Sequence, residues 1–284
     1  NYFDEVFHNA FTTQHNLSVA VGNKKSSTFV SLAYLKNNGI IKNTDSERYS
    51  VTLNNETKIN KWLTLGARVR LMRKTTNQPY DGIGRVIMMM ANGYPFSTPY
   101  LQDGKTYGGT QALYLSGDKA GEPIVDTRNP FPDLYNGLNQ STNNFMKGNA
   151  FVTINFMEGL TLTAQYNGQF NNNSQDKYNQ LAYCYTDLEG GNKTKPLDYP
   201  TTLYVYRGVT DEYYSTFFAN LNFNRTFNQI HDISGVLGYQ QESTVSKTSS
   251  AQKTNPPKDN LHQVDAGTSD PIAKGNKTEL RMMS

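Results

Sequence analysis

The stretch Leu63-Thr64-Leu65-Gly66-Ala67-Arg68-Val69-Arg70-Leu71 alternates strictly between apolar residues and residues that are polar or small. Successive side chains of a β-strand point to opposite faces, so this pattern predicts a strand with one apolar face and one wet face. Both arginines fall on the wet face. The segment from Trp62 to Lys74 is also close to the ~9–11 residues with which a tilted strand crosses a bilayer.

The same alternation predicts strands elsewhere in the chain. We expect seven more, with the least regular alternation in the last, at residues 16–22, 30–34, 49–54, 149–156, 160–170, 217–224 and 233–239. Glu279 to Ser284 reads as the start of another strand. The sequence therefore predicts an all-β fold.

The connections between these strands alternate between tight and long. The tight turns are residues 23–26, 59–61, 157–159 and 228–230, and the others are 36–47, 75–144, 176–211 and 243–278. A soluble sandwich has no reason to keep all its tight turns at one end, whereas an outer-membrane barrel has short periplasmic turns and long external loops. We therefore predict an antiparallel transmembrane β-barrel in which residues 16–22 run toward the periplasm and residues 75–144 form a long extracellular loop.

Side-chain placement agrees with this prediction. Lys147 joins Arg68 and Arg70 on the wet face, and Arg225 lies at a strand end from which it can snorkel to the interface. Aromatic residues lie near strand ends, where an interfacial girdle belongs, at Tyr34, Tyr49, Trp62 and Tyr213.

Composition excludes other classes. Hydrophobic residues make up 36% of 284 residues, and the longest apolar run, Val86 to Ala91, is far below the ~20 residues of a spanning helix. A mean hydropathy of −0.65 combined with 19 Tyr and 14 Phe suits strands with one wet face. A net charge of +3 without a basic stripe argues against nucleic-acid binding.

The first quarter of the chain resembles the SusC/RagA family of TonB-linked outer-membrane proteins (TonB-dependent receptors). The resemblance starts at Asp4-Glu5-Val6-Phe7-His8-Asn9-Ala10 and His15-Asn16-Leu17-Ser18-Val19-Ala20-Val21-Gly22-Asn23. It continues through residues 29–35, 38–41, 48–54 and 62–66, with Phe3 and Ala20-Val21 as departures from the family pattern. Asn129-Pro130 and Arg281 to Ser284 are also similar to the family.

The resemblance implies a 22-stranded barrel filled by a plug domain, of which residues 1–284 would supply about eight early strands and no plug. It also implies a SusD-like surface lipoprotein, energy from a TonB complex, and a place in the outer membrane of a Gram-negative bacterium of the Bacteroidetes type, in contact with its lipid. Asn1 follows no charged or apolar leader, so we expect the targeting signal, and further strands, outside this sequence.

Aromatic residues on the predicted external loops are the candidate ligand contacts, because sugar rings stack on them. They are Tyr94, Tyr100, Tyr107, Tyr114, Tyr204 and Tyr206. Ordinary loop packing is the alternative for each. The longest loop also contains a segment with helical spacing, Gly82 to Asn92, which we expect to pack within the loop.

No catalytic motif, resident cofactor or zinc-ligand spacing is present. The histidines His8, His15, His231 and His262 are scattered, and Cys184 has no activating neighbour. Asp118, Glu122 and Asp126 could hold Ca²⁺ in one loop, although a solvated acidic loop is the favoured interpretation.

The sequence therefore predicts a transporter, not an enzyme, that imports a bulky nutrient such as an oligosaccharide or a peptide. A passive porin or adhesin barrel and a soluble carbohydrate-binding β-sandwich are the alternatives.

Overall fold

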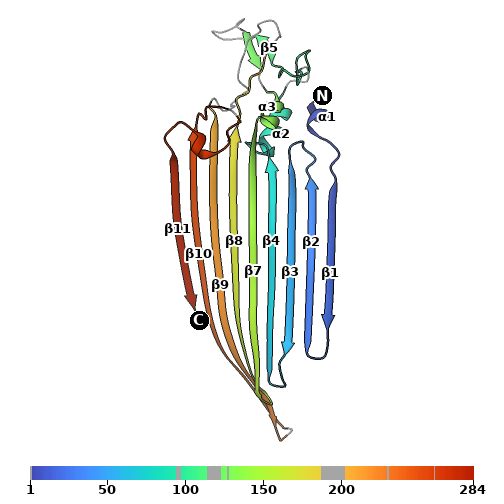
Figure 1. The fold of residues 1–284 in the computed structure, drawn as a ribbon, viewed down its shortest axis with the longest axis vertical. Coiled ribbons are helices and arrows are strands. Elements are labelled where there is room, and N and C mark those ends of the chain that lie inside the picture. Colours follow the sequence, from blue (N-terminus) through green and yellow to red (C-terminus); the bar gives the residue numbers. More distant parts are fainter. Residues whose placement is uncertain are drawn as a thin grey trace.

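The computed structural model describes residues 2–93, 97–113, 123–126, 128–186, 202–228, 230–258 and 260–284, with strands β5 and β6 described by their backbone alone. Nine antiparallel strands form one sheet in the order β1-β2-β3-β4-β7-β8-β9-β10-β11 (Figure 1). They are β1 (Thr12–Gly22), β2 (Ser26–Asn38), β3 (Asp45–Lys58), β4 (Leu63–Gln78), β7 (Gly137–Met157), β8 (Leu160–Asn179), β9 (Tyr204–Phe227), β10 (His231–Thr254) and β11 (Ile272–Met283). The all-β prediction is confirmed, and all nine expected strands are present.

The remaining elements lie in the connections between these strands. They are α1 (Tyr2–Val6), α2 (Ile83–Asn92), the hairpin β5 (Thr110–Leu113) and β6 (Pro123–Asp126), α3 (Pro130–Tyr135) and a 3-10 helix at Val264–Ala266. The helix expected at Gly82 to Asn92 is confirmed as α2. Within the part of the chain that the structure describes, no helix is long and apolar enough to span a membrane.

The two ends of the sheet differ. Figure 1 shows the tight turns at its lower end and helices α1, α2 and α3 at its upper end. The tight turns are built from short polar side chains that bond their own backbone: Asn23 Oδ1 accepts from the N–H groups of Lys25 and Ser26, and Asn60 Oδ1 accepts from those of Trp62 and Leu63.

The upper parts of the strands are longer than the alternation predicted. β4 continues to Gln78 and β7 begins at Gly137, so the connection expected at 75–144 comprises residues 79–136. Amide and carboxylate groups join the strands there instead of apolar contacts: Asn144 Nδ2 donates to Asn172 Oδ1, and Asn172 Nδ2 donates to Asp211 Oδ1. Strands that are polar on both faces carry no apolar period, which is why their extent was underestimated.

A small hydrophobic core lies above the sheet. It joins α1, the β2–β3 connection, α2 and α3, and its buried members are Tyr2, Val6, Ile41, Val86, Met90, Phe131 and Leu134. We call these elements the cap. Many large apolar residues of the sheet are exposed, for example Leu17 at 65% and Val21 at 68%, and the hydrophobic core of the described residues lies in the cap instead of on the sheet.

Candidate functional site

The two faces of the sheet differ in chemistry. One, which we call the apolar face, carries the side chains that share the orientation of Leu17. A straight row of register partners on this face crosses seven strands and is apolar or aromatic throughout, at Leu17, Leu32, Val51, Leu71, Met146, Phe170 and Tyr213. A continuous apolar band of this width, exposed on an isolated sheet, needs a partner medium to cover it.

The upper limit of this band slopes across the sheet. Tyr34 on β2 is among the topmost aromatic side chains of the apolar face, and its row of register partners reaches β10 at Lys247. The topmost aromatic residue of the apolar face on β10 is Tyr239, eight residues lower than Lys247. Above it, Gln241 and Ser243 interrupt the apolar residues of this face, and Val245 stands alone beyond them as the register partner of Tyr213. The band therefore descends from β2 to β10 relative to the strands.

The tight turns descend in the same direction. The last residue pair before the β1–β2 turn is Gly22 with Ser27. Its row of register partners across the sheet reaches β10 at Gln240. The strand continues nine residues further, to His231, before its own turn. Figure 1 shows this stepwise descent of the turns from β1 to β10 along the lower edge.

Both slopes give a similar angle. At about 3.3 Å per residue, eight or nine residues correspond to about 26–30 Å along the strands, and six strand spacings of about 4.8 Å correspond to about 29 Å across them. The resulting tilt of roughly 42–46° is close to the ~35–45° of strands in membrane barrels. If the band followed the rows of register partners instead, it would include Glu279 on β11, which is the register partner of Val245. The Glu279 carboxylate pairs with Lys277 and Arg281.

The opposite face, which we call the polar face, carries cations and amides. Arg68, Arg70 and Lys147 belong to it, as predicted, and the Arg68 guanidinium lies 5.1 Å from the centre of the Phe151 ring. In its middle, Asn167 Oδ1 accepts from Asn149 Nδ2 at 2.7 Å and from Gln165 Nε2 at 2.6 Å, and Asn167 Nδ2 donates to Thr216 Oγ1 at 2.8 Å. These side chains bond one another across three strands.

An aromatic group occupies the upper rim of the polar face. The rings of Tyr204 and Tyr206 stack at 6.4 Å, Tyr80 meets Tyr204 edge-on at 5.9 Å, and Lys177 Nζ lies 4.8 Å from the centre of the Tyr80 ring. Tyr204 Oη donates to Gln252 Oε1 at 2.8 Å, which fixes its ring. Half-buried aromatic faces beside a cation and amides suit a ligand that offers both apolar and polar groups. We call Tyr80, Lys177, Tyr204 and Tyr206 the rim cluster.

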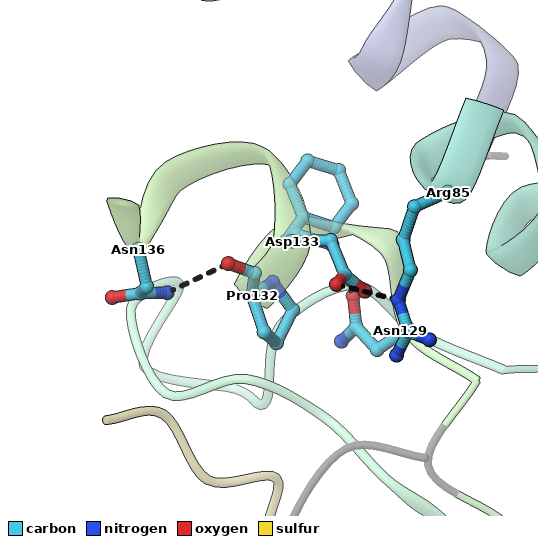
Figure 2. Close-up of polar contacts among 6 residues, drawn as sticks. Arg85, Asn129, Pro132, Asp133 and Asn136 are labelled. Carbon is cyan, nitrogen blue, oxygen red and sulfur yellow. Dashed lines mark hydrogen bonds and ion pairs between the residues drawn. The ribbon is translucent and has the colours of Figure 1, made fainter. Parts of the chain in front are cut away.

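The cap is held by polar contacts (Figure 2). Arg85 Nε on α2 donates to Asp133 Oδ1 on α3 at 2.8 Å, and Asn136 Nδ2 donates to the Pro132 carbonyl at 3.3 Å. Asn129, which is buried, caps α3 by accepting from Phe131 N–H, and its Nδ2 donates to the carbonyls of Pro99 and Gly108. Asn129 thus ties the long connection to the start of α3.

The six predicted tyrosines separate into different environments. Tyr100 and Tyr107 stack at 5.7 Å and pack against the cap core, where burial raises the pKa of both phenols. Tyr204 and Tyr206 lie in the rim cluster, while Tyr94 and Tyr114 lie outside the described residues. Ligand contact stays a prediction for all six.

Tyr80 and Lys177 were not among the candidates. Tyr80 follows the polar upper end of β4, and Lys177 lies near the upper end of β8, in segments that we had assigned to loops. Recognising that both strands continue is the signal that would have placed them beside Tyr204.

The remaining candidates concern metals and the thiol. Asp118 and Glu122 lie outside the described residues, as does the side chain of Asp126. In the ranges that the structure describes, no group of three or more His, Cys, Asp or Glu side chains could hold a metal ion. Cys184 is buried in the connection that follows β8.

The fold of this chain, and not its sequence, matches known proteins. No family model matches the sequence, and no curated protein matches it. Among solved structures, the RagAB peptide transporter matches with a TM-score of 0.72 and 18% identity, over 99% of this chain and 30% of that one.

The chain has the fold of a segment of RagAB. The RagAB peptide importer in its "closed-closed" and "open-open" states matches with TM-scores of 0.69 and 0.70, at 17% identity and with the same coverage. Our chain therefore spans less than a third of the length of these RagAB chains. The likeness to RagAB agrees with the resemblance in residues 4–66, and at this identity it concerns the fold alone.

Proposed function

We propose that this chain forms part of a transmembrane β-barrel through which a bulky nutrient crosses the outer membrane of a Gram-negative bacterium. The observation that carries the proposal is the common slope of the apolar band and of the tight turns. When the strands are tilted by roughly 42–46°, the band and the turns both become level, as they must where a bilayer and its inner surface are planar. The apolar face then meets lipid, and the polar face lines the lumen.

A soluble β-sandwich is disfavoured because such a fold buries one face of each sheet against another sheet. Here the apolar face carries exposed large apolar side chains on strands β1, β2, β3, β4, β7, β8 and β9, for example at Leu71 (42%) and Tyr166 (54%). In the described residues, the second sheet is the two-stranded hairpin of β5 and β6 in the long connection.

The cargo that we propose is a peptide or an oligosaccharide. The likeness to a peptide transporter favours a peptide. The rim cluster supports either, because aromatic faces beside Lys177 and Gln252 can contact apolar groups, carbonyls and hydroxyls at once. By the same likeness and the sequence resemblance, we propose that transport involves a SusD-like surface lipoprotein and TonB-derived energy, with no enzymatic step by this chain.

Cysteine labelling on intact cells tests the orientation. In the full-length protein, Asp103→Cys in the upper connection should react with a membrane-impermeant maleimide on intact cells. Lys24→Cys in the lower β1–β2 turn should react only after the outer membrane is permeabilised; both positions are exposed, and the native Cys184 is buried. Labelling of Lys24→Cys on intact cells, or equal labelling in a soluble fraction, would contradict the proposal.

Uptake assays test the transport step. Cells that carry the full-length protein should accumulate labelled peptide or oligosaccharide only while the inner membrane is energised. Accumulation that survives collapse of the proton gradient would point to a passive porin, and no accumulation by correctly inserted protein would point to an adhesin.

A further inference from the structure

Arg73 lies on the apolar face of β4, next to the upper limit of the apolar band. Its register partners are Tyr49 on β3 and Asn144 on β7, and the next apolar-face residue below it on β4 is Leu71. Its side chain is exposed and makes no hydrogen bond or ion pair with the described residues. A guanidinium at this position presents its full set of donors outward, at the level where the apolar band ends.

An apolar hollow opens beside Arg73. It has a volume of about 340 Å³, and its lining includes Arg73 and Asn144 together with Tyr49, Val51, Leu71, Met146 and Phe170. The cation and the amide come from the row above the apolar residues. This hollow is therefore amphipathic, with a positive polar margin on an apolar base.

A second hollow adjoins the first and shares Met146 and Phe170 with it. It has a volume of about 660 Å³ and is walled by Tyr166 and Tyr213. Its floor is formed by Gly148 and Gly168, which are direct register partners. A Cβ built on Gly148 would meet nothing within 4 Å.

A larger side chain would therefore fit at Gly148, so packing within the chain does not require a glycine there. Glycine within a strand is less stable than alanine by roughly 0.5–1 kcal/mol, so its presence needs another reason. The structural consequence of the pair is the hollow itself.

We propose that Arg73 and the two hollows form a binding site for an anionic membrane lipid, with the phosphate of the headgroup on the Arg73 guanidinium and an acyl chain across Met146, Phe170 and the Gly148–Gly168 floor. This proposal rests on the proposed function, which turns the apolar face toward lipid. Guanidinium groups bind phosphate through paired N–H donors. An acyl chain removes the apolar walls of both hollows from contact with water or headgroups. Lipid is the occupant because the band continues on both sides of the hollows, from Leu32 on β2 to Phe217 on β9.

The test measures which lipids the full-length protein retains. The protein is reconstituted in nanodiscs with equal amounts of phosphatidylglycerol and phosphatidylcholine and transferred to detergent, and bound lipids are counted by native mass spectrometry. The wild type should retain phosphatidylglycerol several-fold over phosphatidylcholine. Arg73→Gln should lose this preference, and Gly148→Leu, which fills the floor, should lose the retained lipid altogether.

Two matched controls should behave as the wild type. Arg70→Gln makes the same charge change on the same strand but on the polar face. Gly235→Leu places the same side chain on the apolar face of β10, at a glycine whose Cβ also meets nothing within 4 Å. Equal retention of both lipids by the wild type, or equal losses in the variants and their controls, would overturn the lipid site.

A separate reporter distinguishes failure of this site from failure of the proposed function. In the full-length protein, the fluorescence that Leu32→Trp adds to that of the unsubstituted protein should be quenched by lipids with brominated acyl chains, because Leu32 lies in the band. Quenching without any lipid preference would overturn the lipid site alone. Absence of quenching in correctly folded protein would overturn the membrane orientation and the lipid site together.

Discussion

The Nε of Arg85 donates a 2.8 Å hydrogen bond to Oδ1 of Asp133, and this bond joins α2 to α3 across the cap (Figure 2). The Asp133 side chain is only 1% exposed, and its Oδ2 has no hydrogen-bond partner among the described residues. Burial of this carboxylate outweighs the attraction of Arg85 and raises the pKa of Asp133 to about 6. The protonated acid therefore fits the cap better than the carboxylate does.

The first prediction is that the cap loses stability as the pH rises from 5 to 7.5. The folded pKa of Asp133 lies above its unfolded value, so the contribution of this group is present in full below about pH 4 and is lost as the pH rises through about 6. A shift of about two units corresponds to at most roughly 3 kcal/mol. Hydrogen exchange of the α3 amides, corrected for intrinsic rates, should show this loss, and Asp133→Asn should remove the pH dependence. A cap more stable at pH 7.5 would contradict the assignment.

The second prediction concerns Asn129, whose side chain makes three hydrogen bonds in a buried position. Asn129→Ala removes the helix cap and leaves two carbonyls without their donor, so it should destabilise the cap by about 1–3 kcal/mol. Asn129→Ser keeps an acceptor for Phe131 N–H and should cost less. Protease protection of the long connection measures both. Equal, negligible effects would show that the cap does not depend on this residue.

The third prediction tests the two faces of β4. Leu65 lies on the apolar face, opposite Val152, and Thr64 lies on the polar face, opposite Thr153. Leu65→Arg should destabilise the barrel by ~2–4 kcal/mol, because it places a charge in lipid, whereas Thr64→Arg should cost much less. Urea unfolding of the full-length protein in bilayers measures the difference. Equal costs would reverse the assignment of the faces.

The fourth prediction addresses the rim cluster. Tyr206→Ala and Tyr204→Ala should each raise the cargo concentration needed for half-maximal uptake by several-fold. Tyr204→Phe keeps the ring but loses the bond to Gln252, and should have a smaller effect. Tyr166→Ala, on the apolar face, is the matched control and should leave the half-maximal concentration unchanged. If the rim and control variants have equal uptake at equal surface levels, the rim cluster is a packing feature.

The part of the fold that carries the apolar band was predictable because alternation reports a difference between two environments. Leu63 to Leu71 alternate because one face of β4 is apolar and the other wet, and this held for each of the eight strands. Above the band that difference vanishes. Residues such as Asn144 and Asn172 are polar on a face that is apolar lower down, so the true ends of β7 and β8 could not be placed from periodicity.

The cap was not predictable beyond α2. Its core brings Tyr2 together with Phe131, whose ring centres lie 6.1 Å apart, from segments far apart in the sequence. The local signal was present at Asn129-Pro130, an N-cap residue followed by proline at the first helical position. That signal places the start of a short helix but does not identify what the helix packs against. The rim cluster was missed in part for the same reason, since Tyr80 and Tyr204 meet only through the sheet.

Under the proposed transport function, the amide network around Asn167 has a consequence for how cargo would move along the polar face. Gln165, Asn167 and Thr216 already spend hydrogen-bonding capacity on one another, so they compete weakly for the carbonyls or hydroxyls of a passing molecule. Among the described residues of this network, Asn149 Oδ1 is an acceptor without a hydrogen-bond partner. The time that a cargo molecule stays bound would then be set at the rim cluster, and the polar face below the rim cluster would bind the released cargo only weakly.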